Sequence, residues 1–157
     1  MTLAQQILWG SGFLGLCLIV QVLVLAICTL FLPGVRFKLK NQRLAIEVVV
    51  TLLVSLGFVV FALTAQVWIW AWVLIVYDIL PDWNSAVYFS LVTFTSLGYG
   101  DIVLGPEVRV FTSFGSVTGL LSFGLSTAFL VATMGGINRE HLTIQSNGEN
   151  KRASGAP

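Results

Sequence analysis

The sequence predicts an all-α membrane protein with three transmembrane helices and a short re-entrant helix, followed by a loop, before the third span. The side chains are 57% apolar and only 10% charged, and the mean hydropathy is +0.93, whereas a soluble domain needs far more surface charge. Three apolar runs each exceed the roughly 20 residues that cross a bilayer. A fourth segment of about a dozen residues, between the last two runs, is too short to cross.

The first predicted span covers about residues 7–32 of an N-terminal segment 1–33. Pro33 and Gly34 are expected to end it, because both residues disfavour a continuing helix. Gln21 lies in the middle of this apolar run. An unsatisfied amide is costly in hydrocarbon, so Gln21 is expected to hydrogen-bond to a neighbouring helix or to its own backbone.

A basic connection, residues 34–43, follows the first span. Connections rich in lysine and arginine remain on the cytoplasmic side of a membrane, so this one is predicted to be a cytoplasmic loop and the N-terminus to lie outside. The polar tail 137–157, rich in Asn, Ser and Gly, is expected to be disordered and cytoplasmic. The basic residues of the loop are Arg36, Lys38, Lys40 and Arg43.

The second apolar run, residues 44–80, is much longer than one crossing requires. Two full spans do not fit, because each would be too short and no charged turn divides them. A single outer helix is therefore predicted, either strongly tilted or broken near Gly57 or near residues 64–66. Aromatic residues towards its end suit a belt at the outer membrane interface; they are Trp68, Trp70, Trp72 and Tyr77.

Residues 83–95 form the short segment, and Asp82 or Asn84 is the expected cap at its start. A helix of this length that does not span must be buried in protein at membrane depth. Its carboxyl end carries the negative end of the helix dipole and would favour a cation. The last span, residues 107–134, is expected to end at Gly135 and Gly136.

The loop between the short helix and the last span contains the string Thr95-Ser96-Leu97-Gly98-Tyr99-Gly100-Asp101. Alternating glycines allow φ > 0 without a Cβ clash, so successive carbonyl groups can face one way. A column of carbonyl oxygens can replace the water shell of a cation. The string resembles the Thr-Val-Gly-Tyr-Gly-Asp signature of potassium channels, and the resemblance covers about residues 48–136, within a pore domain 44–136.

The resemblance implies a selectivity filter at residues 96–101. Carbonyl oxygens of Ser96, Leu97, Gly98 and Tyr99 would coordinate K⁺, which is the permeating ion, and Gly100 would close the outer end. No cofactor is implied. Tyr99 would point away from the ions and pack against a neighbouring subunit. Residues expected to support the filter are Thr95, Asp101, Tyr88 and Phe89.

Two departures from the family pattern bear on selectivity. Ser96 stands where the family usually has Thr, and Leu97 replaces a β-branched residue, so the inner site is expected to be softer. A weakly selective monovalent cation channel is therefore an open alternative. Val92 occupies the place where some members carry a carboxylate that pairs with the Asp after the filter. By sequence, Asp101 lacks that partner.

The last span resembles the pore-lining inner helix of the family. In that helix a glycine serves as a hinge, and Gly119 is the corresponding candidate here. Close packing against the short helix is an equally open explanation, since glycine in membrane helices serves both purposes. Further residues would line the cavity or form an apolar gate; they are Phe123, Thr127, Val131 and Met134.

One filter strand cannot surround an ion, so the resemblance implies a homotetramer with a central pore in the lipid bilayer of the cell membrane. The filter mouth would face outside. No nucleic acid or soluble partner is indicated. A non-conducting membrane scaffold or sensor subunit is a further alternative. An enzyme is not expected, because the single histidine, His141, lies in the tail and no nucleophile–base pair or metal cluster occurs in the spans.

Overall fold

The computed structural model describes residues 2–39 and 44–154, and for residues 38, 44 and 137–154 it describes the backbone only. The elements in these ranges are helices α1 (Leu3–Leu39), α2 (Leu44–Val76), α3 (Trp83–Phe94) and α4 (Arg109–Ser154). Within them, three helical stretches are long and apolar enough to cross a membrane: Leu3–Phe37, Ala45–Val76 and Arg109–Gly136. The predicted helices are therefore all present.

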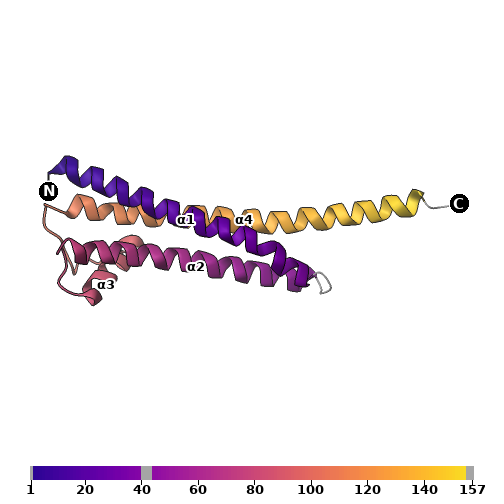
Figure 1. Cartoon of the computed structure of the whole chain (residues 1–157), viewed down its shortest axis with the longest axis horizontal. Coiled ribbons are helices and arrows are strands. Elements are labelled where there is room, and N and C mark those ends of the chain that lie inside the picture. Colours follow the sequence, from indigo (N-terminus) through magenta and orange to yellow (C-terminus); the bar gives the residue numbers. More distant parts are fainter. Residues whose placement is uncertain (1, 40–43, 155–157) are drawn as a thin grey trace.

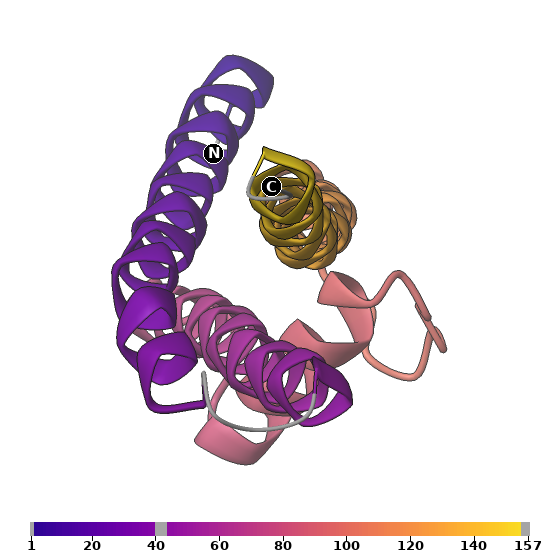
Figure 2. The same cartoon turned by 90° about the vertical axis from the view of Figure 1, so that its right-hand side faces the viewer.

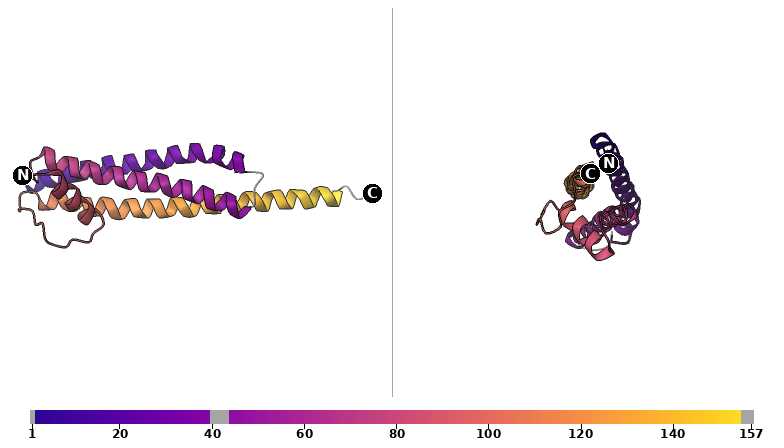
Figure 3. Two further views of the ribbon diagram at one scale, coloured as in Figure 1. Left: turned by 90° about the horizontal axis from the view of Figure 1, so that it is seen from below. Right: turned by 90° about the vertical axis from the view of Figure 1, so that its left-hand side faces the viewer.

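The three long helices lie side by side, and α4 extends well beyond the other two at its C-terminal end (Figure 1). The N-terminus of α1, the short helix α3, the following loop and the start of α4 all lie at one end (Figures 1 and 3). Seen along the helices, α3 lies beside α2 and α4 on one flank (Figure 2). The N-terminus and the loop therefore share one end of the molecule, as the predicted topology requires.

The first helix does not end where the sequence predicts. Pro33 lies inside α1, which continues to Leu39, so residues 34–39 of the predicted loop are helical. Proline removes one backbone N–H and disfavours the preceding turn, yet membrane helices tolerate it where the freed groups are satisfied again. Arg36 on this extension pairs with Glu47 on α2 at 3.2 Å. Lys40 and Arg43 lie outside the described residues.

The second helix is continuous from Leu44 to Val76, with no break at Gly57 or at residues 64–66. It ends four residues before the predicted boundary, because the chain turns there. Asp78 has φ +50°, and the N–H of Ile79 donates to the carbonyl of Leu74 at 2.9 Å. This left-handed residue with a six-to-one hydrogen bond is a Schellman cap, which satisfies carbonyls that the helix end would otherwise leave unpaired.

The fourth helix also exceeds its prediction. Its backbone passes through Gly135 and Gly136 and remains helical to Ser154, so the expectation of a disordered tail differs from the structure. Glycine inside a helix costs only about 1 kcal/mol relative to alanine and does not by itself end one. No proline follows until residue 157.

An aromatic cluster joins the long helices near the end that carries α3. The ring of Trp70 lies 6.3 Å from that of Phe13 and 5.6 Å from that of Phe111. Trp70 is buried, whereas Trp68 and Trp72 are exposed. Residues two apart point to opposite sides of a helix, while residues four apart share a side. The prediction of a single aromatic belt is therefore wrong for Trp70, which belongs to the core.

A chain of buried side-chain hydrogen bonds crosses the middle of the three long helices. The amide of Gln66 donates to Gln21 Oε1 at 2.6 Å, and the amide of Gln21 donates to Ser126 Oγ at 2.8 Å. Ser122 Oγ in turn donates to Gln66 Oε1 at 2.7 Å. Gln21 thus bonds to neighbouring helices, one of its two predicted alternatives. The chain links α1, α2 and α4 where hydrocarbon cannot satisfy polar groups.

The start of α4 is capped by a side chain from another helix. Gln6 Oε1, on α1, accepts from the N–H groups of Val110 and Phe111 at 3.1 and 3.3 Å. Its amide donates to the carbonyl of Pro106 at 3.2 Å. The first N–H groups of a helix have no partners within the helix, so this capping from α1 stabilises the start of α4. The first helix is thereby attached to the loop that precedes α4.

Candidate functional site

Helix α3 begins at a well-defined cap. Asp82 Oδ1 accepts from the N–H of Ser85 at 3.0 Å, and Oδ2 accepts from the Ser85 hydroxyl at 2.8 Å. These hydrogen bonds lower the pKa of the Asp82 carboxyl. Asp82 is thus the cap, rather than Asn84, and the helix spans Trp83–Phe94, within one residue of the predicted 83–95.

The other end of α3 passes directly into the predicted filter. Ser96 has φ +59°, and its N–H donates to the carbonyl of Thr93 at 2.9 Å. The N–H of Leu97 donates to the carbonyl of Val92 at 2.9 Å. These are the two bonds of a Schellman cap, in which the left-handed residue is usually glycine. An unbranched serine accepts that conformation more readily than the β-branched threonine that the family pattern has there.

Positive φ recurs at every second residue from 96 to 100. Gly98 has φ +53° and Gly100 has φ +78°, following Ser96. Left-handed backbone is accessible to glycine without steric cost, which accounts for glycine at both places. Where left-handed residues alternate with ordinary ones, neighbouring peptide groups can face the same side instead of alternating as in a strand.

The side chains of the loop are uncovered on the single chain. Residues 95–101 are all exposed, and apolar Leu97 and aromatic Tyr99 are exposed to 59% and 67%. No other part of the described chain covers these two side chains, so they offer apolar surface to lipid or to another protein chain.

Asp101 has a partner that the sequence analysis missed. The Tyr88 hydroxyl donates to Asp101 Oδ2 at 2.5 Å across 13 residues. This bond lowers the pKa of Asp101 and raises that of Tyr88. The expectation considered only a carboxylate at Val92, whose side chain is buried. A tyrosine one turn earlier on the same helix supplies the hydrogen bond instead, as the four-residue spacing of Tyr88 and Val92 could have indicated.

The remaining support residues have different surroundings. Phe89 packs on the buried cluster that contains Ala71, Leu74 and Ala86, so on this chain it contacts α2. Thr95 Oγ1 donates to the carbonyl of Leu91 at 2.7 Å, which closes the last turn of α3. Among the predicted support residues on α3 and at its end, only Tyr88 makes a side-chain hydrogen bond to the loop after the predicted filter, at Asp101.

Helix α4 contacts the last turn of α3 in three ways. Ser116 Oγ donates to the carbonyl of Thr93 at 2.8 Å. A Cβ added at Gly119 would overlap the carbonyl oxygen of Phe94. The rings of Phe94 and Phe123 meet edge to face, with centroids 5.9 Å apart. Absence of a side chain at Gly119 is therefore what allows α4 to approach the end of α3.

Further along α4, toward its C-terminus, lie the other predicted cavity and gate residues, Thr127, Val131 and Met134. The hydroxyl of Thr127 donates to its own helix, at the carbonyl of Phe123. Val131 and Met134 are exposed and line an apolar groove of about 430 Å³ between α2 and α4. The structure therefore does not bring these residues together with the loop at residues 96–101.

Charges near the loop are mostly acidic. Asp82, Asp101 and Glu107 are exposed at this end, with Arg109 at the start of α4. In the part of the chain that the structure describes, no group of three or more His, Cys, Asp or Glu side chains is arranged to hold a metal ion.

A family model described as "Ion channel" matches residues 48–135, more than half of the chain. Neither a search of curated proteins nor one of solved structures gave a match. The matched range begins in α2 and ends in α4, so it contains α3 and the loop with alternating φ. Helix α1 lies outside it.

Proposed function

Because the chain belongs to the ion channel family, we propose that it forms a potassium channel with residues 96–101 as its filter. Carbonyl oxygens of Ser96, Leu97, Gly98 and Tyr99 take the place of water around K⁺, and Gly100 forms the outer end. The observation that carries this proposal is the positive φ at residues 96, 98 and 100, directly after α3. The cap of α3 accounts for the positive φ of Ser96, whereas no helix end requires it at Gly98 and Gly100, so the support comes from the two glycines that continue the alternation.

The proposed assembly is a homotetramer around a central axis. One chain supplies one filter strand, and four strands are needed to enclose a dehydrated cation. Exposed Leu97 and Tyr99 support this arrangement, because they offer apolar surface for neighbouring subunits to cover. Four α3 helices would then direct the negative ends of their dipoles towards the axis.

The inner helix of the proposed pore is α4. We assign Phe123, Thr127, Val131 and Met134 to the pathway below the filter, with Val131 and Met134 as an apolar gate. For Gly119 we favour close packing over a hinge. A bend there would have to separate the helix from the Phe94 carbonyl that it touches.

In the proposed orientation the loop end of the molecule faces outside and the end of α1 near Arg36 faces the cytoplasm, by the positive-inside rule. The membrane would be the cell membrane. Exposed carboxylates at Asp82, Asp101 and Glu107 then surround the outer mouth. A negative mouth raises the local concentration of cations.

Flux into liposomes tests the proposal. Reconstituted protein should pass K⁺, discriminate against Na⁺ and be blocked by Ba²⁺. Gly98→Ala should abolish K⁺ flux, because alanine at φ +53° strains the filter backbone. Gly124→Ala is the matched control. An added Cβ meets no atom within 4 Å at either position, so the two changes differ in backbone conformation rather than in crowding.

Other results of the flux assay would favour one of the two alternative functions or refute the proposed filter. Equal flux of K⁺ and Na⁺ would support the weakly selective cation channel that the Ser96-Leu97 sequence leaves open. Folded, correctly inserted protein without any flux would support a scaffold or sensor subunit. K⁺ flux that survives Gly98→Ala unchanged would refute the proposed filter.

A further inference from the structure

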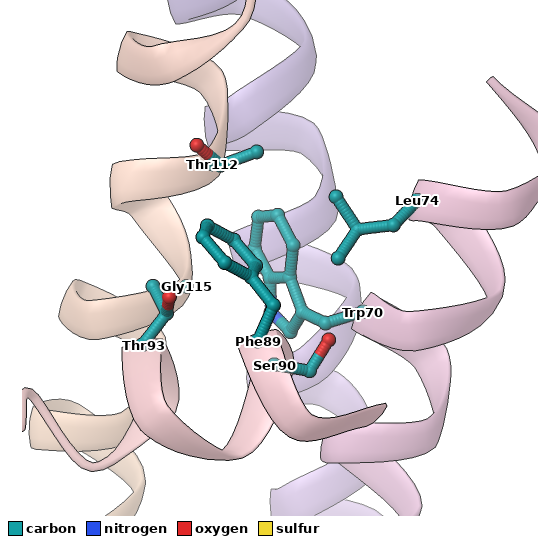
Figure 4. A pocket seen from close by; sticks show the side chains of 7 residues that line it. All are labelled: Trp70, Leu74, Phe89, Ser90, Thr93, Thr112 and Gly115. Carbon is teal, nitrogen blue, oxygen red and sulfur yellow. The ribbon is translucent and has the colours of Figure 1, made fainter. Parts of the chain in front are cut away.

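A small, partly open cavity lies between α2, α3 and α4. Its lining residues include Trp70, Ser90, Thr112 and Gly115 (Figure 4). The space open to the centre of a water molecule is about 10 Å³. That is about the smallest space that holds one water.

Two buried polar atoms at this cavity have no hydrogen-bond partner. They are Trp70 Nε1 and Ser90 Oγ, and each of the two side chains is only 3% exposed. An indole N–H can only donate, whereas a hydroxyl can donate and accept. Buried polar atoms are almost always hydrogen-bonded, so two such atoms beside one cavity require an explanation.

Ser90 differs from most buried helical hydroxyls that the structure describes. Ser55, Thr118 and Ser126 each donate to the carbonyl four residues earlier on their own helix, which is the usual arrangement in apolar surroundings. Ser90 and Thr51 make no such bond, and of these two only Ser90 lines the cavity. The Ser90 hydroxyl is therefore available to a partner in the cavity.

We propose that this cavity binds one structural water molecule, which accepts a hydrogen bond from Trp70 Nε1–H and hydrogen-bonds to Ser90 Oγ. Thr112 turns its methyl group toward Trp70, and its hydroxyl donates to carbonyls of Val108 and Arg109 on its own helix (Figure 4). The water therefore has two side-chain partners, which is the lower end of the usual range for a buried water.

The bound water would brace α3 against α2. It connects Trp70 on α2 to Ser90 on α3, and a water-mediated link can be nearly as favourable as a direct hydrogen bond. Ser116 holds the end of the same helix directly. The bracing concerns the position of α3 and does not depend on which ion, if any, passes through the loop.

The direct test is NMR of the full chain in detergent micelles with ¹⁵N-labelled tryptophan indoles. Five tryptophans give five indole signals, and Trp70→Phe identifies the signal of Trp70. A bound water predicts a rotating-frame Overhauser cross peak between water and the Trp70 indole proton, with the sign of direct contact. Absence of that peak in the unaltered protein would overturn the proposal.

Stability of Ser90→Ala gives a second, independent readout. If the water is bound, loss of the hydroxyl should reduce the ratio of folded to unfolded protein roughly fivefold, the usual effect of one hydrogen bond. Thr51→Val is the matched control, since Thr51 Oγ1 is also buried and unpartnered but does not line this cavity; it should not lower that ratio. A neutral or stabilising Ser90→Ala would overturn the proposal, because removal of an unpaired hydroxyl costs nothing.

Discussion

The buried hydrogen-bond chain through Gln66 makes the sharpest prediction about stability. Gln66→Leu keeps a similar volume but removes the partner of Gln21 Oε1 and of the Ser122 hydroxyl, at 2.6 and 2.7 Å. Each polar group left unpaired in a buried site costs about 1–3 kcal/mol. Hydrogen bonds between membrane helices contribute only about 0.6 kcal/mol on average. Two lost bonds at that value give the lower limit of the expected destabilisation, about 1 kcal/mol. Two unpaired groups at about 3 kcal/mol each give the upper limit, about 6 kcal/mol.

We expect a loss near the lower part of that range, about 2 kcal/mol, because Ser122 can turn its hydroxyl to a carbonyl of its own helix. This loss corresponds to roughly a 30-fold change in the folded-to-unfolded ratio. Unfolding of the full chain in mixed micelles, titrated with a denaturing detergent and followed by circular dichroism, measures it. Thr64→Val is the control, since its exposed hydroxyl bonds only to its own helix, at Val60.

A loss below about 0.5 kcal/mol for Gln66→Leu, no larger than a surface substitution, would refute this reasoning. A combined variant provides a second check. Replacing Gln21 and Gln66 by leucine and Ser122 by alanine removes both sides of each broken bond, so it should be less destabilised than Gln66→Leu alone. If the combined variant is the less stable of the two, the stranded polar groups are not the cause of the loss.

Two further predictions concern contacts of α3 with α4 and with the loop that follows α3. Gly119→Ala should displace α3 from α4, because its Cβ would overlap the Phe94 carbonyl; K⁺ flux should fall at least tenfold, whereas Gly124→Ala should leave it unchanged. Tyr88→Phe should lower the thermal midpoint at neutral pH by removing the bond to Asp101. The pKa of Asp101 is lowered from 3.8, so its contribution is complete above that pH and is lost as the pH falls through the lowered value. The pKa of Tyr88 is raised from 10.0, so its contribution is complete below that pH and is lost as the pH rises through the raised value. The difference in midpoint between the two proteins should therefore be constant from about pH 5 to 9 and shrink outside that interval.

Local chemistry accounts for the parts that sequence analysis predicted correctly. Three long apolar runs make three long helices, because hydrocarbon leaves the backbone no other way to satisfy its polar groups. Asp82 caps α3 through a contact only three residues away. The glycines at 98 and 100 have the positive φ that their spacing indicated. Each of these predictions rests on interactions within a few residues.

Predictions failed where the outcome depended on another part of the chain. Pro33 and Gly135 resemble helix ends in sequence, yet both lie inside helices. Trp70 was placed in an interfacial belt with its neighbours, but contacts with Phe13 and Phe111 place it in the core. The bond from Tyr88 joins α3 to Asp101 in the loop that follows, so it depends on how that loop folds back on the helix.

Composition and one seven-residue string, by themselves, predicted the three long apolar helices and the ion channel family of this chain. Only the tertiary structure decided how the helix outside the matched range is attached, through Gln21 to the middle of the bundle and Gln6 to the start of α4. It also shows that a side chain at Gly119 would overlap the carbonyl of Phe94. The physical reason is the sequence separation of the interacting residues. Backbone preference and hydrophobicity act within one segment, whereas hydrogen bonds between buried amides and close approach of helices form only after distant helices have packed.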